Sequence, residues 1–201
     1  PAVALAHLLA SMRDADGRIL ISGFADLVRP LSPAERAAIE AAPDEDAAIA
    51  RSLALGRHEM VRSRLVDAIT IPAINVRGLR AGAVGEQATN AVPVDAQVSI
   101  DFRLVPDLTP DDVKRLVEAH IRAQGFHVVR TAPDEATRRA HARVALLEWG
   151  TGYPGYRAPM DTPLGRAVVS LLGQASGAVP VVMPNTGGSL PLYLFADILQ
   201  A

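Results

Sequence analysis

The sequence predicts a mixed α/β chain. Its main part is α+β, a small antiparallel sheet with helices on one face, and a partial α/β segment follows. Three observations favour this class. Residues 94–104 alternate between apolar and polar side chains, which is the period of a half-buried strand. A capped amphipathic helix begins at Thr109. After Trp149 the composition changes to a loop rich in Gly, Pro and Tyr, so we expect two domains, residues 1–147 and 148–201.

The first 66 residues predict three helices. Apolar side chains at i, i+3, i+4 and i+7 indicate a helix over residues 2–13, and these are Leu5, Leu8, Leu9 and Met12. Ser32, followed by proline and then an acid in the first turn, begins a second helix that ends near residue 42. A third, acid-started helix covers about residues 46–54. We interpret residues 31–66 as an alanine-rich helical excursion with little chemistry.

The strands of the predicted sheet lie between residues 70 and 149. Residues 70–79 form the first strand, and Pro72 favours an edge position for it. The alternating strand follows, then a helix over residues 109–125 that ends at a glycine. Residues 126–130 and 142–149 predict two more strands. This order indicates a small antiparallel sheet with helices on one face.

The last segment is too small to bury much apolar surface by itself. It predicts a helix over residues 163–176, a short apolar strand over 179–183, a loop over 184–189 and the start of an apolar helix. About 50 residues make a poor core. We therefore interpret residues 148–201 as a piece of another domain.

Composition and charge exclude several classes of protein. Lys plus Arg is 20 against 22 for Asp plus Glu, so we expect no nucleic-acid partner bound through bulk charge. The absence of cysteine excludes disulfide frameworks, zinc fingers and thiol nucleophiles. No apolar run reaches the roughly 18–20 residues of a membrane helix, so we expect no membrane partner. The ends show no signal peptide and fall inside patterned sequence, which favours a fragment of a longer protein. We expect that parent protein to be cytoplasmic.

The sequence contains no convincing metal or catalytic motif. His58-Glu59 starts like the zinc-protease helix motif, but Arg62 stands where the second histidine would be. None of the five histidines lies at ligand spacing from another. We therefore expect neither a catalytic residue nor a metal ligand in this chain.

Three places are candidates for binding, and each has a plainer alternative. Arg103, on the polar face of the alternating strand, is suited to hold a carboxylate, or is a solvated partner of Asp101. The loop Gly187-Gly188-Ser189 allows backbone N–H groups to approach a ligand, or is a turn before a helix. Asn90, before the alternating strand, is by default a turn residue.

Five segments of the sequence form a pattern through their order and spacing. They are residues 8–24, 75–79, 90–93, 100–106 and 183–191. Together they resemble the dinuclear-zinc metallopeptidase and amidohydrolase family, which includes carnosinase, cytosolic non-specific dipeptidase, acetylornithine deacetylase and succinyl-diaminopimelate desuccinylase. The first four segments are similar to the lid, or dimerisation, domain of that family, and the last is similar to a substrate loop of its catalytic domain.

The resemblance implies a role for each candidate. Arg103 would bind the free carboxylate of the substrate, while Asn90, Gly187, Gly188 and Ser189 would hold the substrate and the developing oxyanion. Dipeptidases of the family often have Thr in place of Asn90 and Glu in place of Thr186, so the substrate preference stays open. The substrate would be a small peptide or an N-acyl amino acid.

The resemblance also implies that this chain and the rest of a longer parent protein supply different parts of the active site. In such enzymes two zinc ions activate the attacking water and a glutamate acts as general base. The family's metal ligands correspond to positions before Pro1 and after Ala201, so we expect two zinc ions in the parent and none in this chain. Residues 1–147 would be the lid, forming a homodimer through its sheet, and residues 148–201 a fragment of the catalytic domain.

Two hypotheses therefore stay open. The chain is a fragment of a metal-dependent peptidase, or it is a stand-alone, non-catalytic dimerisation or binding module. A His-x-Asp motif encoded upstream would favour the first, and an authentic start codon at Pro1 would favour the second.

Overall fold

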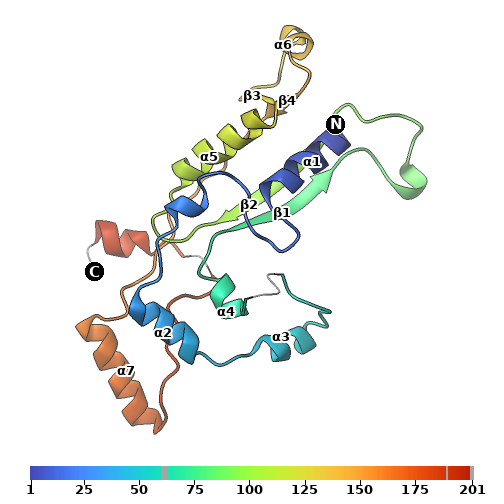
Figure 1. Cartoon of the computed structure of the whole chain (residues 1–201). Helices are drawn as coiled ribbons and strands as arrows, with labels where there is room; N and C mark the ends of the chain where they lie inside the picture. Colours follow the sequence, from blue (N-terminus) through green and yellow to red (C-terminus); the bar gives the residue numbers. More distant parts are fainter. Residues whose placement is uncertain (60–62, 189, 200–201) are drawn as a thin grey trace. The chain divides into compact units, whose positions relative to one another are not determined.

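The computed structural model describes residues 1–59, 63–188 and 190–199 (Figure 1). These residues form two compact units. The first unit comprises Pro1–Leu27, Ala73–Arg103 and Leu108–Tyr153, and the second comprises Val28–Pro72, Leu104–Asp107 and Pro154–Ala201. The domain boundary expected at residue 147 stays a prediction.

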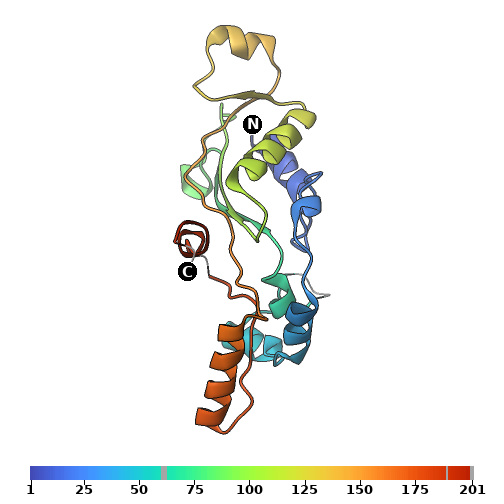
Figure 2. The same cartoon turned by 90° about the vertical axis from the view of Figure 1, so that its left-hand side faces the viewer.

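The first unit is built on a two-stranded antiparallel sheet. Strand β1 (Ala73–Arg80) pairs with β2 (Gln97–Arg103). Helices α1 (Ala2–Met12) and α5 (Pro110–Ala123) lie on the same face of this sheet (Figures 1 and 2). The buried core of the unit comprises Leu8, Met12, Ile21, Phe24, Ile74, Leu108, Val113, Val117 and Ile121. The predicted fold class, helices on one face of a small antiparallel sheet, is confirmed.

A β-bulge at Arg77 interrupts the register of this sheet. Val76 lies opposite Ile100 and Gly78 opposite Ser99, so β1 has one residue more than β2 at this point. Beyond the bulge, Leu79 lies opposite Val98. The apolar residues of both strands therefore share the face that the helices cover, and the polar residues share the other face.

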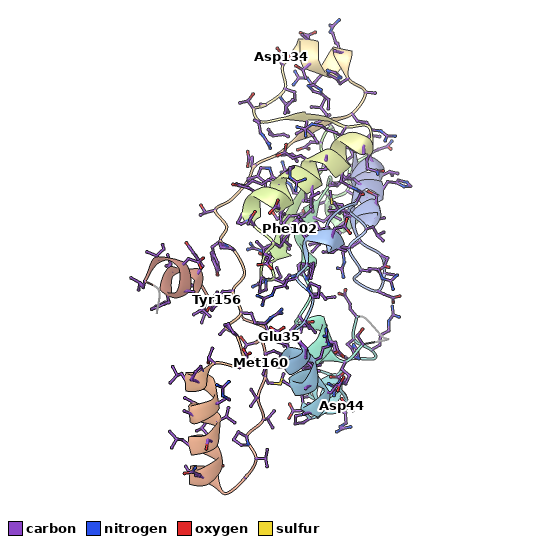
Figure 3. The ribbon with its side chains drawn as sticks, turned by 60° about the vertical axis from the view of Figure 1, so that its left-hand side comes forward. Glu35, Asp44, Phe102, Asp134, Tyr156 and Met160 are labelled. Carbon is purple, nitrogen blue, oxygen red and sulfur yellow. The ribbon has the colours of Figure 1, made fainter. Side chains whose placement is uncertain are left out.

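Strands β3 (His127–Val129) and β4 (Val144–Leu146) correct one expectation. The sequence predicts them in the antiparallel sheet, but they pair with each other in parallel. Parallel neighbours need a crossover connection rather than a tight hairpin. That connection contains α6 (Glu135–Ala140), whose N-cap is Asp134 (labelled in Figure 3).

The second unit is mainly helical. It contains α2 (Pro33–Ala41), α3 (Asp46–Ser52), α4 (Leu65–Ala68), α7 (Pro163–Ser176) and a π-helical turn, η3 (Leu194–Ile198). The unit has no strand among its described residues, so the strand predicted over residues 179–183 is wrong. An extended segment becomes a strand only when a neighbour accepts its backbone hydrogen bonds, and Val179 is 93% exposed.

Helix starts agree with the sequence patterns. Ser32 accepts the backbone N–H of Glu35, and the Glu35 carboxylate accepts the N–H of Ser32, which together form a capping box. Thr109 and Asp112 form the same arrangement at α5. Two short 3₁₀ turns, η1 (Ala25–Leu27) and η2 (Gly85–Gln87), lie in the first unit. In the described ranges, no helix is both long and apolar enough to cross a membrane.

Glu35 also joins α2 to the segment that follows residue 153. Arg157 Nε lies 2.6 Å from Glu35 Oε1, and the two side chains are 1% and 4% exposed. Arg29 approaches the same oxygen at 3.6 Å. Glu35 and Met160, both labelled in Figure 3, line a cavity of about 210 Å³ beside this ion pair.

Candidate functional site

Arg103 lies on the uncovered polar face of the sheet, at the end of β2. Residues two apart on a strand point to the same side, and Arg103 Nε lies 2.7 Å from Asp101 Oδ2. The side chains are 54% and 29% exposed. Across the sheet, Asn75 lies opposite Asp101 and Ala73 opposite Arg103. The ion pair with Asp101, which is the plainer alternative, is therefore present, and it holds the Nε side of the guanidinium group.

The rest of this sheet face is polar as well. Arg80 Nη2 donates a hydrogen bond of 3.1 Å to Gln97 Oε1, and Gln97 Nε2 donates one of 3.1 Å to Asp95 Oδ2. Ser99 lies opposite Gly78 between this end and the Arg103 end. Polar groups thus lie along the whole length of this face, and at the Arg80 end they are bonded to one another.

On the face of the sheet that the helices cover, the end of β2 next to Arg103 contacts Trp149 through Phe102. The ring of Phe102 lies 6.1 Å from the ring of Trp149. Trp149 Nε1 donates a hydrogen bond of 3.1 Å to Glu118 on α5, and Arg122 and Arg130 donate to the same carboxylate. A buried acceptor with three donors stays fixed, so this network holds β2 in place.

The charge of Glu118 depends on this network. Burial raises the pKa of the carboxyl group by disfavouring the ionised form. The hydrogen bonds and charge of Arg130, with the bonds from Trp149 and Arg122, outweigh burial, so the pKa lies below its usual value. The sequence does not reveal this network, because Arg130 and Trp149 lie on other segments and only Arg122 shares α5 with Glu118.

Asn90 and the glycine loop are the other candidates. Asn90 is exposed in the connection between β1 and β2, in the same unit as Arg103. Gly187 and Gly188 are exposed and belong to the second unit. Among the described residues, a Cβ atom on either would meet one atom, at 3.9 Å or 4.0 Å, which leaves room for a ligand beside this backbone. Ser189 lies outside the described residues.

An unforeseen contact anchors the glycine loop. Asn185 Nδ2 donates a hydrogen bond of 2.7 Å to the carbonyl oxygen of Ile69, which is 116 residues away in the chain. Pro184, just before it, is buried. No local sequence pattern predicts this contact. The one indication in the sequence is that Asn185 lies two residues before the glycine pair.

The described residues do not fit a metal centre. No three His, Asp or Glu side chains among them lie close enough together to hold a metal ion. His120 Nε2 lies 2.9 Å from Ser11 Oγ, and burial lowers its pKa. The rings of His127 and His141 stack 3.7 Å apart.

Comparison with known proteins gives one family. The sequence profile of the peptidase dimerisation domain matches residues 1–128. Cys-Gly metallodipeptidase Dug1 of Saccharomyces cerevisiae is 27% identical over 128 residues, which cover 62% of this chain and 26% of Dug1.

Solved structures agree with the profile. An M20 family metallo-carboxypeptidase of Sulfolobus solfataricus, Sso-CP2, matches with a TM-score of 0.79 and 28% identity, and the match covers 100% of this chain and 48% of Sso-CP2. Human carnosine dipeptidase 1 matches with a TM-score of 0.72 and 19% identity, over 100% of this chain and 41% of the human protein. Dug1p of Saccharomyces cerevisiae matches with a TM-score of 0.69 and 19% identity, over 98% of this chain and 40% of Dug1p. The likenesses at 19% identity support the fold alone.

The chain thus spans less than half the length of these relatives. The family resemblance predicted from the motifs of the lid and the substrate loop is confirmed. Since the profile covers more than half of the residues, the chain belongs to the M20 peptidase dimerisation domain family.

Proposed function

We propose that this chain supplies the lid and part of the catalytic domain of a metal-dependent peptidase or amidohydrolase. The reaction would be hydrolysis of an amide bond in a dipeptide or an N-acyl amino acid. The profile match over residues 1–128 carries the proposal. The names of the relatives, a metallodipeptidase and a metallo-carboxypeptidase, support it.

The metal centre of the proposed enzyme would belong to its remaining part. We propose two zinc ions there, with residues 1–147 as the lid and residues 148–201 as the contribution to the catalytic domain. Helix α7 supports a larger partner, because it has no buried residue and exposes Leu164, Val168, Leu171 and Leu172. Cytoplasmic location is a further part of the proposal.

Arg103 would bind the free carboxylate of the substrate. Its planar fork of N–H donors matches a carboxylate, and a strand holds it more firmly than a loop would. Contact with Asp101 at Nε orients that fork. Asn90, Gly187, Gly188 and Ser189 would hold the substrate and the oxyanion that develops on the amide carbonyl.

The test of this role uses the full-length enzyme. Arg103→Ala should lower kcat/KM for substrates with a free carboxylate, by an amount that corresponds to roughly 2–5 kcal/mol of transition-state binding, because a closed site leaves the substrate charge unpaired. Arg103→Lys should restore only part of this kcat/KM, since a point charge lacks the planar fork. For carboxamide analogues, the same variants should change kcat/KM little.

Arg80→Ala is the matched control, because Arg80 lies at the other end of the same polar face. It should leave kcat/KM unchanged. If both Arg103 variants cleave free-carboxylate substrates as well as the wild type does, Arg103 is only the partner of Asp101.

The open edge of β1 and the family match also suit a stand-alone dimerisation or binding module. In the part of the chain that the structure describes, β1 pairs with β2 alone, so its other edge can pair with a second copy. Metal analysis of the natural full-length protein separates the two functions. Stoichiometric zinc together with dipeptide hydrolysis supports the enzyme, and a metal-free, inactive dimer supports the module.

A further inference from the structure

The loop that contains Gly187 and Gly188 is held by a helical segment distant in sequence. Asn185, two residues before the glycine pair, donates its side-chain amide to the Ile69 carbonyl at 2.7 Å. The side chain of Ile69 is also the nearest neighbour of Gly187, 3.9 Å from where a Cβ atom would lie. Both contacts are within the second unit.

Ile69 is itself firmly placed. It is the C-cap of α4, and its backbone N–H donates to the Leu65 carbonyl at 3.2 Å. The next residue, Thr70, is buried, and its hydroxyl donates to the Asp67 carbonyl at 2.7 Å. The carbonyl that accepts from Asn185 therefore belongs to an ordered turn.

Helix α4 is tied in turn to the two helices before it. Arg64, its N-cap, donates to the carbonyls of Ala42 and Ile39 at the end of α2. The backbone N–H of Leu65 donates to the carboxylate of Asp46 on α3, at 3.1 Å and 3.2 Å to its two oxygens. A continuous set of hydrogen bonds thus runs from α2 and α3 through α4 to the glycine loop.

From these contacts we propose that Asn185 is a positioning residue: it fixes the Gly187-Gly188 backbone for substrate by anchoring the loop to Ile69. The inference rests on the proposed function for the role of the loop, but not for the anchoring itself. The alanine-rich helices of residues 31–66, which by their sequence have little chemistry, would thus support the loop through α4.

An asparagine is needed at this position because the partner is a carbonyl oxygen. The amide of Asn donates two N–H groups, whereas an ionised Asp of the same shape only accepts. Asn185→Asp therefore breaks the anchor without removing volume and directs a negative charge at the Ile69 oxygen. Gln174→Glu is a matched control, since it makes the same chemical change at an exposed amide on α7 that donates only a 3.3 Å bond to Ser170.

The first measurement is amide hydrogen exchange of the full-length protein, at short labelling times. Asn185→Asp should speed exchange in the peptide that contains Gly187 and Gly188, while the peptides of α2 and α7 keep their wild-type rates. Gln174→Glu should leave the loop unchanged. Wild-type exchange of the loop in Asn185→Asp, or faster exchange across the whole unit, overturns the anchoring.

The second measurement is steady-state kinetics on the same variants. Misplacing a binding group by about 1 Å can cost roughly a hundredfold in rate. Asn185→Asp should therefore lower kcat/KM ten- to hundredfold, mainly in kcat, with melting temperature and bound metal unchanged. Faster loop exchange with unchanged kcat/KM overturns the positioning role. If the wild-type protein hydrolyses no peptide, the proposed function fails, and the exchange measurement still decides the anchoring.

Discussion

Glu35 and Arg157 show how much a single pair of buried charges can contribute. Burial alone raises the pKa of Glu35, but the backbone hydrogen bond from Ser32 and the charge of Arg157 outweigh it, so its pKa is lowered. An acid with a lowered pKa stabilises the fold above its unfolded pKa, near 4.5. That contribution is lost as the pH falls through the folded pKa.

Arg157→Met should destabilise the protein by about 3–5 kcal/mol at neutral pH, because it leaves Glu35 buried without its nearest cation. The double variant Glu35→Met with Arg157→Met should be less destabilised than the sum of the two single variants. Urea denaturation at pH 7 measures both. Arg139→Ala, at an exposed pair with Glu135, should change stability by no more than about 0.5 kcal/mol. Strict additivity of the two single changes would contradict the coupling.

Residue-level prediction from the sequence succeeded where the pattern is local. Strand alternation placed Asp101 and Arg103 on one face, and the structure shows their ion pair. The sequence marked Ser32 as a helix cap and Glu35 only as a first-turn acid. Its pairing with Arg157, like that of Asn185 with Ile69, joins distant segments, and no local spacing encodes such a contact.

At the level of elements, the loop after residue 153 passes very close to the chain that leaves β2. A Cβ atom on Gly155 would lie 2.7 Å from the carbonyl carbon of Val105 and 2.8 Å from the oxygen of Leu104. Contacts this short with backbone cannot be relieved by turning a side chain. Only glycine therefore fits here without moving one of the two segments.

Gly155→Ala should destabilise the protein by about 1–3 kcal/mol through this overpacking. Gly150→Ala is the control, because nothing lies within 4 Å of its Cβ position. That change should be neutral or stabilising by up to about 1 kcal/mol, since alanine restricts the unfolded chain. Thermal denaturation of both variants checks the difference, and equal melting temperatures would refute the close approach.

Helices were predicted from the sequence more accurately than strand pairing. Caps and apolar spacing are local, so α1, α2, α5 and α7 were placed within a few residues. Which strand lies beside which depends on the connections between them. The parallel pairing of β3 with β4 follows from the crossover through α6, and the composition of three-residue strands does not reveal it.

At the level of the whole molecule, the proposed homodimer depends on the open edge of β1. Light scattering at micromolar concentration should give twice the mass of one chain. Because the sequence has no cysteine, single cysteines can map the contact by disulfide formation. Asn75→Cys, Arg77→Cys and Leu79→Cys on β1 should yield linked dimers, and Ala136→Cys on α6 should not. A monomer across the concentration range, or links at α6 alone, would exclude dimerisation through β1.

The bulge at Arg77 lets β1 carry one residue more than its partner and still keep its apolar side chains on one face. If all eight residues of β1 alternated strictly, parity would place Leu79 beside Asn75 on the polar face and turn Arg80 toward the helices. Deleting Arg77 would remove the extra residue itself, so Gly78, Leu79 and Arg80 would keep their partners on β2 in a regular ladder. Comparable sequences should therefore tolerate the loss of this residue and resist the insertion of another one between Ile74 and Arg80.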